Sequence, residues 1–329
     1  MRQLLTRGLL LTVANWPVVA MQWLAEAVFQ ACLALPVFGV AVVGAMVFAG
    51  RLPELLSGDT RALLAMLVTA LINQPVTLTV FAVAFGLALL GGSTLLIAVK
   101  AGSLSVLVQA DAVGATSTPS GWRMTTLRQL RTFSVPLFWA GMRLRGRRFL
   151  QLAAWLALVY ALVGTLYVVG IVTGYQWADE GRWHDLWTRA VAASTVLLFL
   201  AVTAVNVFYL LMQIALASEP IGLRLALRRV RGFVRARVGV LTALFLAVSF
   251  GLALAWIASA VLWTGVGLVA VLPVVGIAMV PLQLVGWAVR GVVFEFITVV
   301  AMSVYVALYR DFYGRNPGPE HVDGPILRP

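Results

Sequence analysis

Residues 221–264 of the chain are IGLRLALRRVRGFVRARVGVLTALFLAVSFGLALAWIASAVLWT, and this stretch decides the fold class. Its first part, residues 221–238, mixes arginines and apolar residues at helical spacing, which is typical of an amphipathic helix at a membrane surface. Its second part, residues 239–264, is apolar and long enough to cross a bilayer, since a helical span takes about 20 residues. The stretch therefore predicts an interfacial helix that leads into a transmembrane helix.

The whole chain has the composition of an integral membrane protein. Of its 329 residues, 62% are hydrophobic and 11% are charged, whereas soluble domains are about 25% charged. This composition excludes a soluble globular fold and a disordered chain, because a water-facing surface cannot hide so many apolar side chains. The single cysteine, Cys32, excludes a disulfide within the chain and a zinc site built on cysteines. The net charge of +12 comes almost entirely from arginines beside apolar stretches, which indicates membrane topology rather than nucleic-acid binding.

Six regions are predicted to span the membrane, which makes the fold an all-α integral membrane protein. They are residues 24–49, 76–99, 150–173, 190–216, 239–264 and 288–309. A further apolar stretch, residues 266–286, contains Pro273 and Pro281. We predict an irregular or interfacial segment here, with a re-entrant pair of half-helices and a seventh span as the alternatives. A seventh span is disfavoured because it would carry the arginines that follow it to the opposite side of the membrane.

Basic residues gather in alternate connections between the predicted spans. The segments before the first span, between the second and third, between the fourth and fifth, and after the sixth hold 18 of the 23 arginines. The other connections balance their arginines with acids or carry no charge. Since arginines near span ends are retained in the cytoplasm, both termini are predicted to be cytoplasmic. The arginine- and alanine-rich composition with one lysine suggests a bacterial protein, so we expect the bacterial inner (plasma) membrane.

One architecture recurs three times along the chain: an amphipathic helix, a span, a short outer connection and a returning span. The result is three hairpins in a single domain, residues 1–313. Residues 314–329, which are rich in proline and glycine, predict a disordered cytoplasmic tail. The amphipathic helices are predicted at residues 123–148 and 221–238, with a weaker copy at residues 3–14.

The arginines of the two stronger amphipathic helices are the candidate binding residues. Each arginine near an anionic leaflet contributes about 1 kcal/mol of attraction. These arginines either bind anionic lipid headgroups or an acidic partner protein, or they only set the membrane topology. They are Arg123, Arg128, Arg131, Arg143, Arg145, Arg147, Arg148, Arg224, Arg228, Arg229, Arg231, Arg235 and Arg237.

A second group of candidates lies inside the predicted spans, where polar side chains are costly and face protein or water. Gln22, Glu26 and Gln30 are spaced by four and share one helix face. Lys100, the single lysine, either pairs with Glu26 or extends its charged end to the inner membrane surface. Glu295 is the acid of the sixth span. Together these side chains form either a path for protons, cations or a polar substrate, or a structural hydrogen-bond seam.

The sequence contains no recognisable catalytic constellation. His184 and Asp185 are neighbours, but no serine within the glycine pattern of a nucleophile elbow accompanies them. The tryptophans around this pair indicate an aromatic belt at the membrane interface. Phosphate-binding and dinucleotide-binding motifs are also absent from the sequence. We therefore expect no enzymatic activity, no cofactor and no metal.

Three short motifs resemble a known family. Residues 213–220, QIALASEP, form the end of a span with an acidic turn, and residues 225–231, LALRRVR, form an amphipathic helix after it. Tyr305, Leu308, Tyr309 and Arg310 are similar to the end of the last span in the same family. The family is the membrane domain associated with glycerophosphodiester phosphodiesterases, with its stand-alone bacterial relatives, and the resemblance covers about residues 75–310.

This resemblance implies a six-helix bundle with interfacial elbows. In that family hydrolysis belongs to a separate soluble barrel with its own histidine and acidic residues. The sequence contains no such barrel, so the resemblance assigns no catalytic residue to this chain.

Two functional hypotheses follow from the sequence. The first is a non-enzymatic inner-membrane scaffold or accessory subunit that binds anionic lipid or an acidic partner through the arginine-rich helices. The second is a small transporter or lipid-moving protein, in which Glu26, Lys100 and Glu295 line a polar path and residues 266–286 act as a gate. A transporter is expected to lose function when Glu26 or Glu295 becomes Gln, and a scaffold when several arginines of residues 221–238 become Gln.

Overall fold

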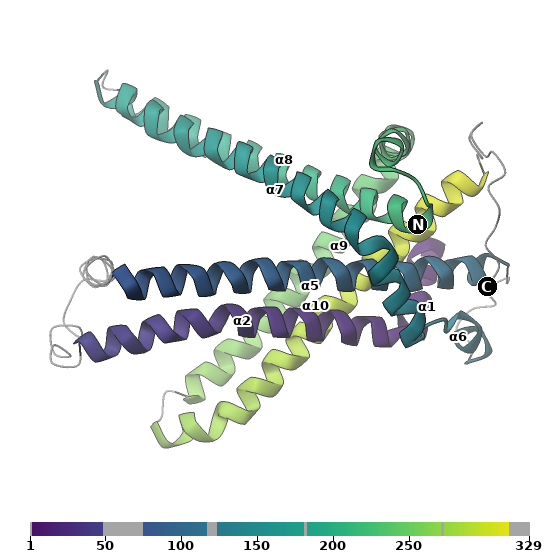
Figure 1. The fold of residues 1–329 in the computed structure, drawn as a ribbon, viewed down its shortest axis with the longest axis horizontal. Coiled ribbons are helices and arrows are strands. Elements are labelled where there is room, and N and C mark those ends of the chain that lie inside the picture. Colours follow the sequence, from purple (N-terminus) through teal and green to yellow (C-terminus); the bar gives the residue numbers. More distant parts are fainter. Residues whose placement is uncertain (1, 49–74, 117–123, 181–182, 271–272, 316–329) are drawn as a thin grey trace. The chain divides into compact units, whose positions relative to one another are not determined.

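The computed structural model describes residues 2–48, 75–116, 124–180, 183–270 and 273–315 (Figure 1). Every regular element within these ranges is a helix, which confirms the predicted all-α class. The elements are α1 (Arg2–Ala14), α2 (Trp16–Phe48), α5 (Pro75–Thr116), α6 (Met124–Leu130), α7 (Val135–Glu180), α8 (His184–Ser218), α9 (Leu223–Ala270) and α10 (Pro273–Arg315). Six of them are long and apolar enough to cross a membrane, namely α2, α5, α7, α8, α9 and α10. This confirms a multi-pass membrane protein with the expected number of candidate spans.

Proline and polar caps define where several helices begin and end. Proline is tolerated in the first helical turn, where its missing N–H has no intrahelical partner, and α5 and α10 both begin at a proline. Ser134 caps α7, because its Oγ accepts a hydrogen bond from the Leu137 N–H at 3.3 Å. Helix α8 ends before Glu219, whose backbone is extended, and Pro220 follows it. Short sequence signals thus fix these boundaries.

The chain divides into two compact units. Unit 2 consists of residues 21–99, and unit 1 contains residues 1–20 and everything from Lys100 onward. Within unit 2, α2 and α5 approach closely at Gly92, where the Phe29 ring occupies the space that a Cβ atom would need. A glycine here allows the two helices to pack, as small residues do in membrane helix pairs.

Unit 1 is organised around a core that we call the α1 core. It consists of α1, residues 100–111 of α5, α6, residues 211–217 of α8 and residues 299–310 of α10. The segments of α5, α8 and α10 are mostly buried, whereas α1 and α6 bury one face each. Leu10 and Leu11 of α1 pack with Ala110 of α5 and Leu130 of α6. On another side of α1, Gly8 lies against Val304 of α10 so closely that a Cβ atom would overlap it. Small residues at these contacts let the helices come close enough for dense packing.

Outside the α1 core the long helices expose most of their apolar side chains. Helices α7 and α8 pack along each other, as Figure 1 also shows. The Tyr167 hydroxyl lies 2.5 Å from Thr195 Oγ1, and the Tyr160 hydroxyl donates to Asn206 Oδ1 at 2.7 Å. The remaining faces of this pair are apolar and exposed, for example at Leu162 and Phe199. In a membrane these faces would contact lipid or another protein.

Residues 266–286 are not irregular where the structure describes them, and their interfacial position stays a prediction. Helix α9 continues to Ala270 and α10 begins at Pro273, so the segment is helical on both sides of residues 271–272. Pro273 is compatible with this because it is the first residue of its helix, and Pro281 lies inside α10, where it removes one intrahelical hydrogen bond. No seventh candidate span is found among the described residues.

The arginine-rich segments also differ from the prediction. Residues 131–134 are not helical, and α7 then runs without a break from Val135 past Arg148 into the apolar stretch. Helix α9 differs from α7, because its backbone is not helical at Arg237 (φ −129°, ψ 23°), close to the predicted boundary between residues 221–238 and 239–264. Since no proline separates the arginines of α7 from the apolar residues that follow, one helix accommodates both.

The helix predicted near the N-terminus is present, and only the first two residues of the predicted C-terminal tail are described. Residues 3–14 form α1, as the helical spacing predicted, although one face of this helix is buried in the α1 core. Residues 314 and 315 belong to α10 rather than to a tail. The rest of the predicted tail lies outside the described residues, as do Arg123 and the connection at residues 50–62.

Candidate functional site

The first third of α9 separates an apolar face from a basic face. Ala226, Val230 and Phe233 are completely buried. The arginines on the other faces of this segment are exposed to the surroundings. They are Arg224, Arg228, Arg231 and Arg235. This arrangement points four cations outward while the apolar side chains hold the segment to the rest of unit 1.

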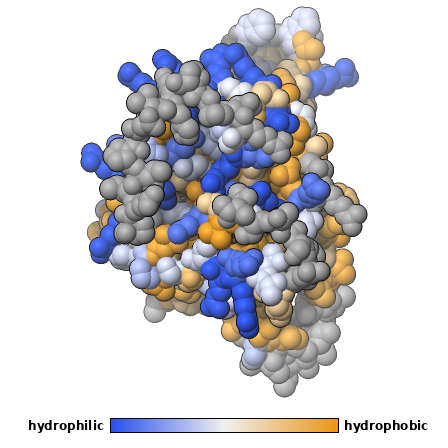
Figure 2. All heavy atoms as spheres, turned by 90° about the vertical axis from the view of Figure 1, so that its right-hand side faces the viewer, coloured by the Kyte–Doolittle hydropathy of each residue, from blue (hydrophilic) through white to orange (hydrophobic). Residues whose placement is uncertain are grey.

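The helices α6 and α7 present arginines in the same way. Phe138 and Phe149 of α7 are buried, whereas neighbouring arginines are exposed. The exposed arginines of this region are Arg128, Arg131, Arg143, Arg147 and Arg148. Figure 2 shows hydrophilic side chains gathered between apolar ones on the face that carries α6 and the C-terminal end of α10. We refer to the exposed arginines of α6, α7, α9 and residue 131 as the arginine surface.

Three of the predicted arginines, Arg145, Arg229 and Arg237, are half-buried and contact other side chains of the protein. The Arg145 Nη1 donates to Ser105 Oγ at 2.5 Å and joins α7 to α5. Arg229 forms an ion pair with Glu219 and also lies over the Tyr313 ring at 5.5 Å. The guanidinium carbon of Arg237 lies 5.9 Å from the centre of the Phe312 ring. All three are partly shielded, so the arginine surface is smaller than the sequence predicted.

A buried ion triad at Asp111 was missed by the sequence analysis. The Asp111 side chain is 1% exposed and lies between two arginines from distant parts of the chain. Arg7 Nη2 of α1 is 2.5 Å from its Oδ1, and Arg310 Nη1 of α10 is 3.2 Å from its Oδ2. The same arginines donate to backbone carbonyls of α5, Arg7 to Asp111 and Arg310 to Val108. The triad therefore locks three helices of unit 1 together.

Asn15 forms a second polar junction in unit 1. Its Nδ2 donates to the carbonyl of Leu11 at 3.0 Å and to that of Leu130 at 2.9 Å. Its Oδ1 accepts the backbone N–H groups of Thr132 and Phe133 at 3.0 and 2.9 Å. The side chain is completely buried, and it satisfies backbone groups that the end of α6 leaves open. Asn15 thus fixes the non-helical link between α6 and α7.

The predicted polar seam of the first span is present in part. Gln30 Nε2 donates to Glu26 Oε1 at 3.3 Å, as their spacing of four residues allows. Gln22 is buried, and its Nε2 has no hydrogen-bond partner among the described protein atoms. Lys100 and Glu295 are both half-buried and both belong to unit 1, whereas Glu26 belongs to unit 2. The pairing of Lys100 with Glu26 stays a prediction.

The described residues include no group of three or more histidines, cysteines or acids placed to hold a metal ion. Comparison with protein-family models, with curated proteins and with solved structures gives no match for the chain. The resemblance to the membrane domain of glycerophosphodiester phosphodiesterases therefore stays a prediction. The function has to be argued from the arginine surface and from the contacts within unit 1.

Proposed function

We propose that the protein is a non-enzymatic scaffold or accessory subunit of a bacterial inner membrane, which binds anionic lipid headgroups through the arginine surface. The observation that carries this proposal is the division of α9, with buried Ala226, Val230 and Phe233 opposite the exposed Arg224, Arg228, Arg231 and Arg235. A helix of this kind rests its cations among headgroups.

The proposal includes a membrane topology. Six spans form three hairpins, both termini are cytoplasmic, and the arginine surface lies at the inner leaflet. The positive charge at the start of α7 and α9 supports this orientation, because arginines next to spans are retained in the cytoplasm. The inner leaflet is also the anionic one, so each exposed arginine there contributes about 1 kcal/mol of attraction.

The lipid that surrounds the protein tests this proposal. The full chain is reconstituted in vesicles of phosphatidylcholine and phosphatidylglycerol, extracted in polymer-bounded discs without detergent, and the lipids of the discs are measured by mass spectrometry. We expect phosphatidylglycerol to be enriched over the bulk vesicle. The double variant Arg228→Gln/Arg231→Gln is expected to lower this enrichment.

The chain offers a matched control for this experiment. Arg189 of α8 and Arg290 of α10 are also exposed, but they lie in the segments predicted to face the other side of the membrane. The variant Arg189→Gln/Arg290→Gln removes the same charge and is expected to leave the enrichment unchanged. Equal effects of the two double variants, or no enrichment in the wild type, would overturn lipid binding by the arginine surface. An acidic protein that co-purifies with the wild type but not with Arg228→Gln/Arg231→Gln would identify the partner as protein instead.

A further inference from the structure

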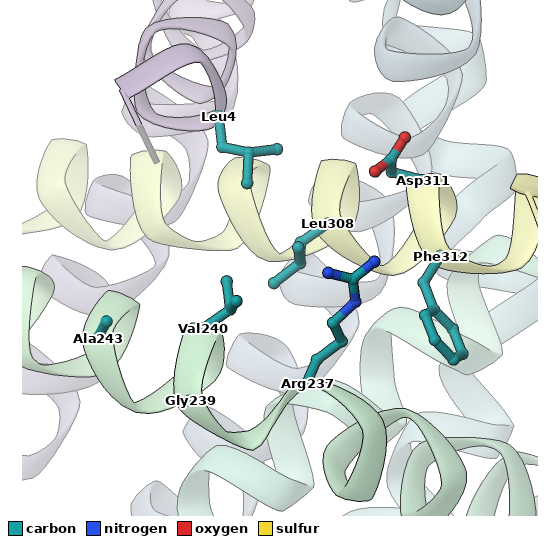
Figure 3. A pocket seen from close by; sticks show the side chains of 8 residues that line it. All are labelled: Leu4, Arg237, Gly239, Val240, Ala243, Leu308, Asp311 and Phe312. Atoms are coloured by element: carbon teal, nitrogen blue, oxygen red, sulfur yellow. The ribbon is translucent and has the colours of Figure 1, made fainter.

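Unit 1 contains a cavity of about 450 Å³ between α1, α9 and α10 (Figure 3). This volume falls within the range of small-molecule sites in proteins, which starts at about 300 Å³. The cavity lies beside the point where the α9 backbone departs from helical geometry, at Arg237. It is lined by Leu4, Arg237, Gly239, Val240, Ala243, Leu308, Asp311 and Phe312.

The lining is apolar except for one cation and one anion. Leu4, Val240 and Leu308 border the same space from three different helices (Figure 3). Arg237 extends from α9 toward α10, and Asp311 stands one helical turn beyond Leu308 on α10. A ligand that fits this lining has an apolar part and a headgroup with charges of both signs.

The position of the cavity along α9 indicates where such a ligand comes from. Arg237 is the last arginine of α9, and the residues after it are those of the apolar span. Exposed apolar side chains such as Val238, Leu246 and Phe250 continue along the helix from the level of the cavity. A lipid whose headgroup enters the cavity would therefore find an apolar surface for its acyl chains.

We propose that this cavity binds one glycerophospholipid whose headgroup carries a phosphate and a primary ammonium group. Arg237 donates hydrogen bonds to the phosphate, since a guanidinium group matches phosphate geometry. Asp311 accepts from the ammonium group, because a carboxylate has several acceptor positions and can serve more than one donor. The apolar side chains of the lining contact the glycerol and the first acyl carbons.

This inference goes beyond the proposed function, since the two sites select different lipids. The arginine surface holds exposed cations and favours anionic headgroups. Asp311 lines the cavity, and its negative charge disfavours a purely anionic headgroup and favours a zwitterionic one. Binding at the cavity can therefore fail while binding at the arginine surface is retained.

Glycines of α9 provide the test. Gly239 lines the cavity, and a Cβ atom there meets no atom within 4 Å, so we expect Gly239→Leu to reduce the space in the cavity. A Cβ atom at Gly251 also meets nothing, and Gly251 does not line the cavity, so Gly251→Leu is the matched control. The full chain is titrated in detergent with phosphatidylethanolamine, and binding is followed by native mass spectrometry.

We expect the wild type and Gly251→Leu to retain one phosphatidylethanolamine per chain. Gly239→Leu is expected to weaken this binding at least about tenfold, which corresponds to about 1.4 kcal/mol. Asp311→Asn is expected to weaken the binding of phosphatidylethanolamine and to strengthen the binding of phosphatidylglycerol, because the charge that repels an anionic headgroup is removed. Excess soluble phosphoethanolamine is expected not to displace the lipid, since it lacks the apolar part.

Three results of the lipid titration would overturn the proposal: unchanged binding by Gly239→Leu, equal losses for both glycine variants, or displacement by soluble phosphoethanolamine. The enrichment of phosphatidylglycerol in discs, measured on the same Gly239→Leu protein, separates the two sites. Lost enrichment in that variant would show that the cavity and the arginine surface do not act independently, and this too would overturn the proposal.

Discussion

The α1 core and the pair formed by α7 and α8 are built from similarly apolar sequence, yet one is buried and the other is exposed. In α10, residues 299–309 are almost fully buried, and in α7 most residues from Trp155 to Val172 are exposed. The difference lies in the residues between the apolar ones. The α1 core has glycines at helix contacts and the polar junctions at Asp111 and Asn15. In the α7 and α8 pair Gly174 packs against Trp187, but a Cβ atom at Gly164 or Gly170 would meet no atom within 4 Å. Apolarity places a helix in the membrane, and small and polar residues specify what it packs against.

The largest effect is expected at the buried ion triad. Asp111→Asn removes the charge between Arg7 and Arg310 and leaves two cations without their shared anion. We therefore expect the free energy of unfolding to fall by about 3 kcal/mol. The apparent unfolding temperature of the full chain in detergent, recorded at one scan rate, measures this loss. Asp185→Asn, an exposed acid in the first turn of α8, is the control and should change the temperature little. Similar temperatures for both variants would mean that the triad does not stabilise unit 1.

Asparagine allows the two regions to be compared with one residue type. Asn15→Ala removes four hydrogen bonds from backbone groups that are buried or half-buried, and we expect the free energy of unfolding to fall by about 2 kcal/mol. Asn206→Ala removes the single bond from Tyr160 in the α7 and α8 pair, and about 0.6 kcal/mol is typical of such a bond in a membrane protein. The same unfolding measurement ranks the two variants, and a larger loss for Asn206→Ala would contradict the comparison.

The effect of a glycine-to-alanine substitution on stability should have opposite signs in the two regions. Gly8→Ala places a Cβ atom against Val304, and we expect overpacking to cost about 1 kcal/mol. Gly164→Ala adds a methyl group in open space and replaces a poor helix former, so stability should stay the same or rise by up to about 1 kcal/mol. Paired unfolding curves of the two variants test this, and destabilisation by Gly164→Ala would show that α7 has a close neighbour at that position.

The smallest effect is expected at Glu295. A scaffold should keep its unfolding temperature and its phosphatidylglycerol enrichment in Glu295→Gln, because the substitution preserves shape. The transporter hypothesis instead expects a proton flux that depends on Glu295. This flux can be measured in vesicles that are loaded with a pH-sensitive dye and placed under an imposed ion gradient. Proton flux in the wild type that Glu295→Gln abolishes would favour the transporter over the scaffold.

The sequence was sufficient to predict the helices but not the contacts between them. An apolar run such as residues 239–264 predicts a helix from local sequence alone, and the whole of this run is helical as part of α9. The boundary of that run was nearly correct too, since the backbone departs from helical geometry at Arg237. For residues 266–286 the prediction rested on charge, because a seventh span would have moved the following arginines to the other side of the membrane. The charge pattern does not distinguish a helix from irregular structure, so the helical backbone of this segment was missed.

The buried ion triad shows what the sequence did not reveal. Arg7 and Arg310 lie 104 and 199 residues from Asp111, and many other arginines were equally plausible partners. One signal was available: Asp111 directly follows the mostly apolar residues 104–110, at a depth where an unpaired carboxylate is costly. The roles of Arg145, Arg229 and Arg237 were equally hidden, because each depends on a neighbour from another helix.

The contact between α1 and α10 has a consequence for synthesis. Thr12 of α1 and Ser303 of α10, whose hydroxyl oxygens are 3.1 Å apart, are separated by 291 residues. Asp111 can meet Arg7 early, but Arg310 follows it by 199 residues, which take roughly 10–40 s to make at about 5–20 residues per second. During this interval α1 has no α10 to pack against. The nascent protein must therefore keep its first helix available, at the membrane or in the insertion machinery, until its last helix arrives.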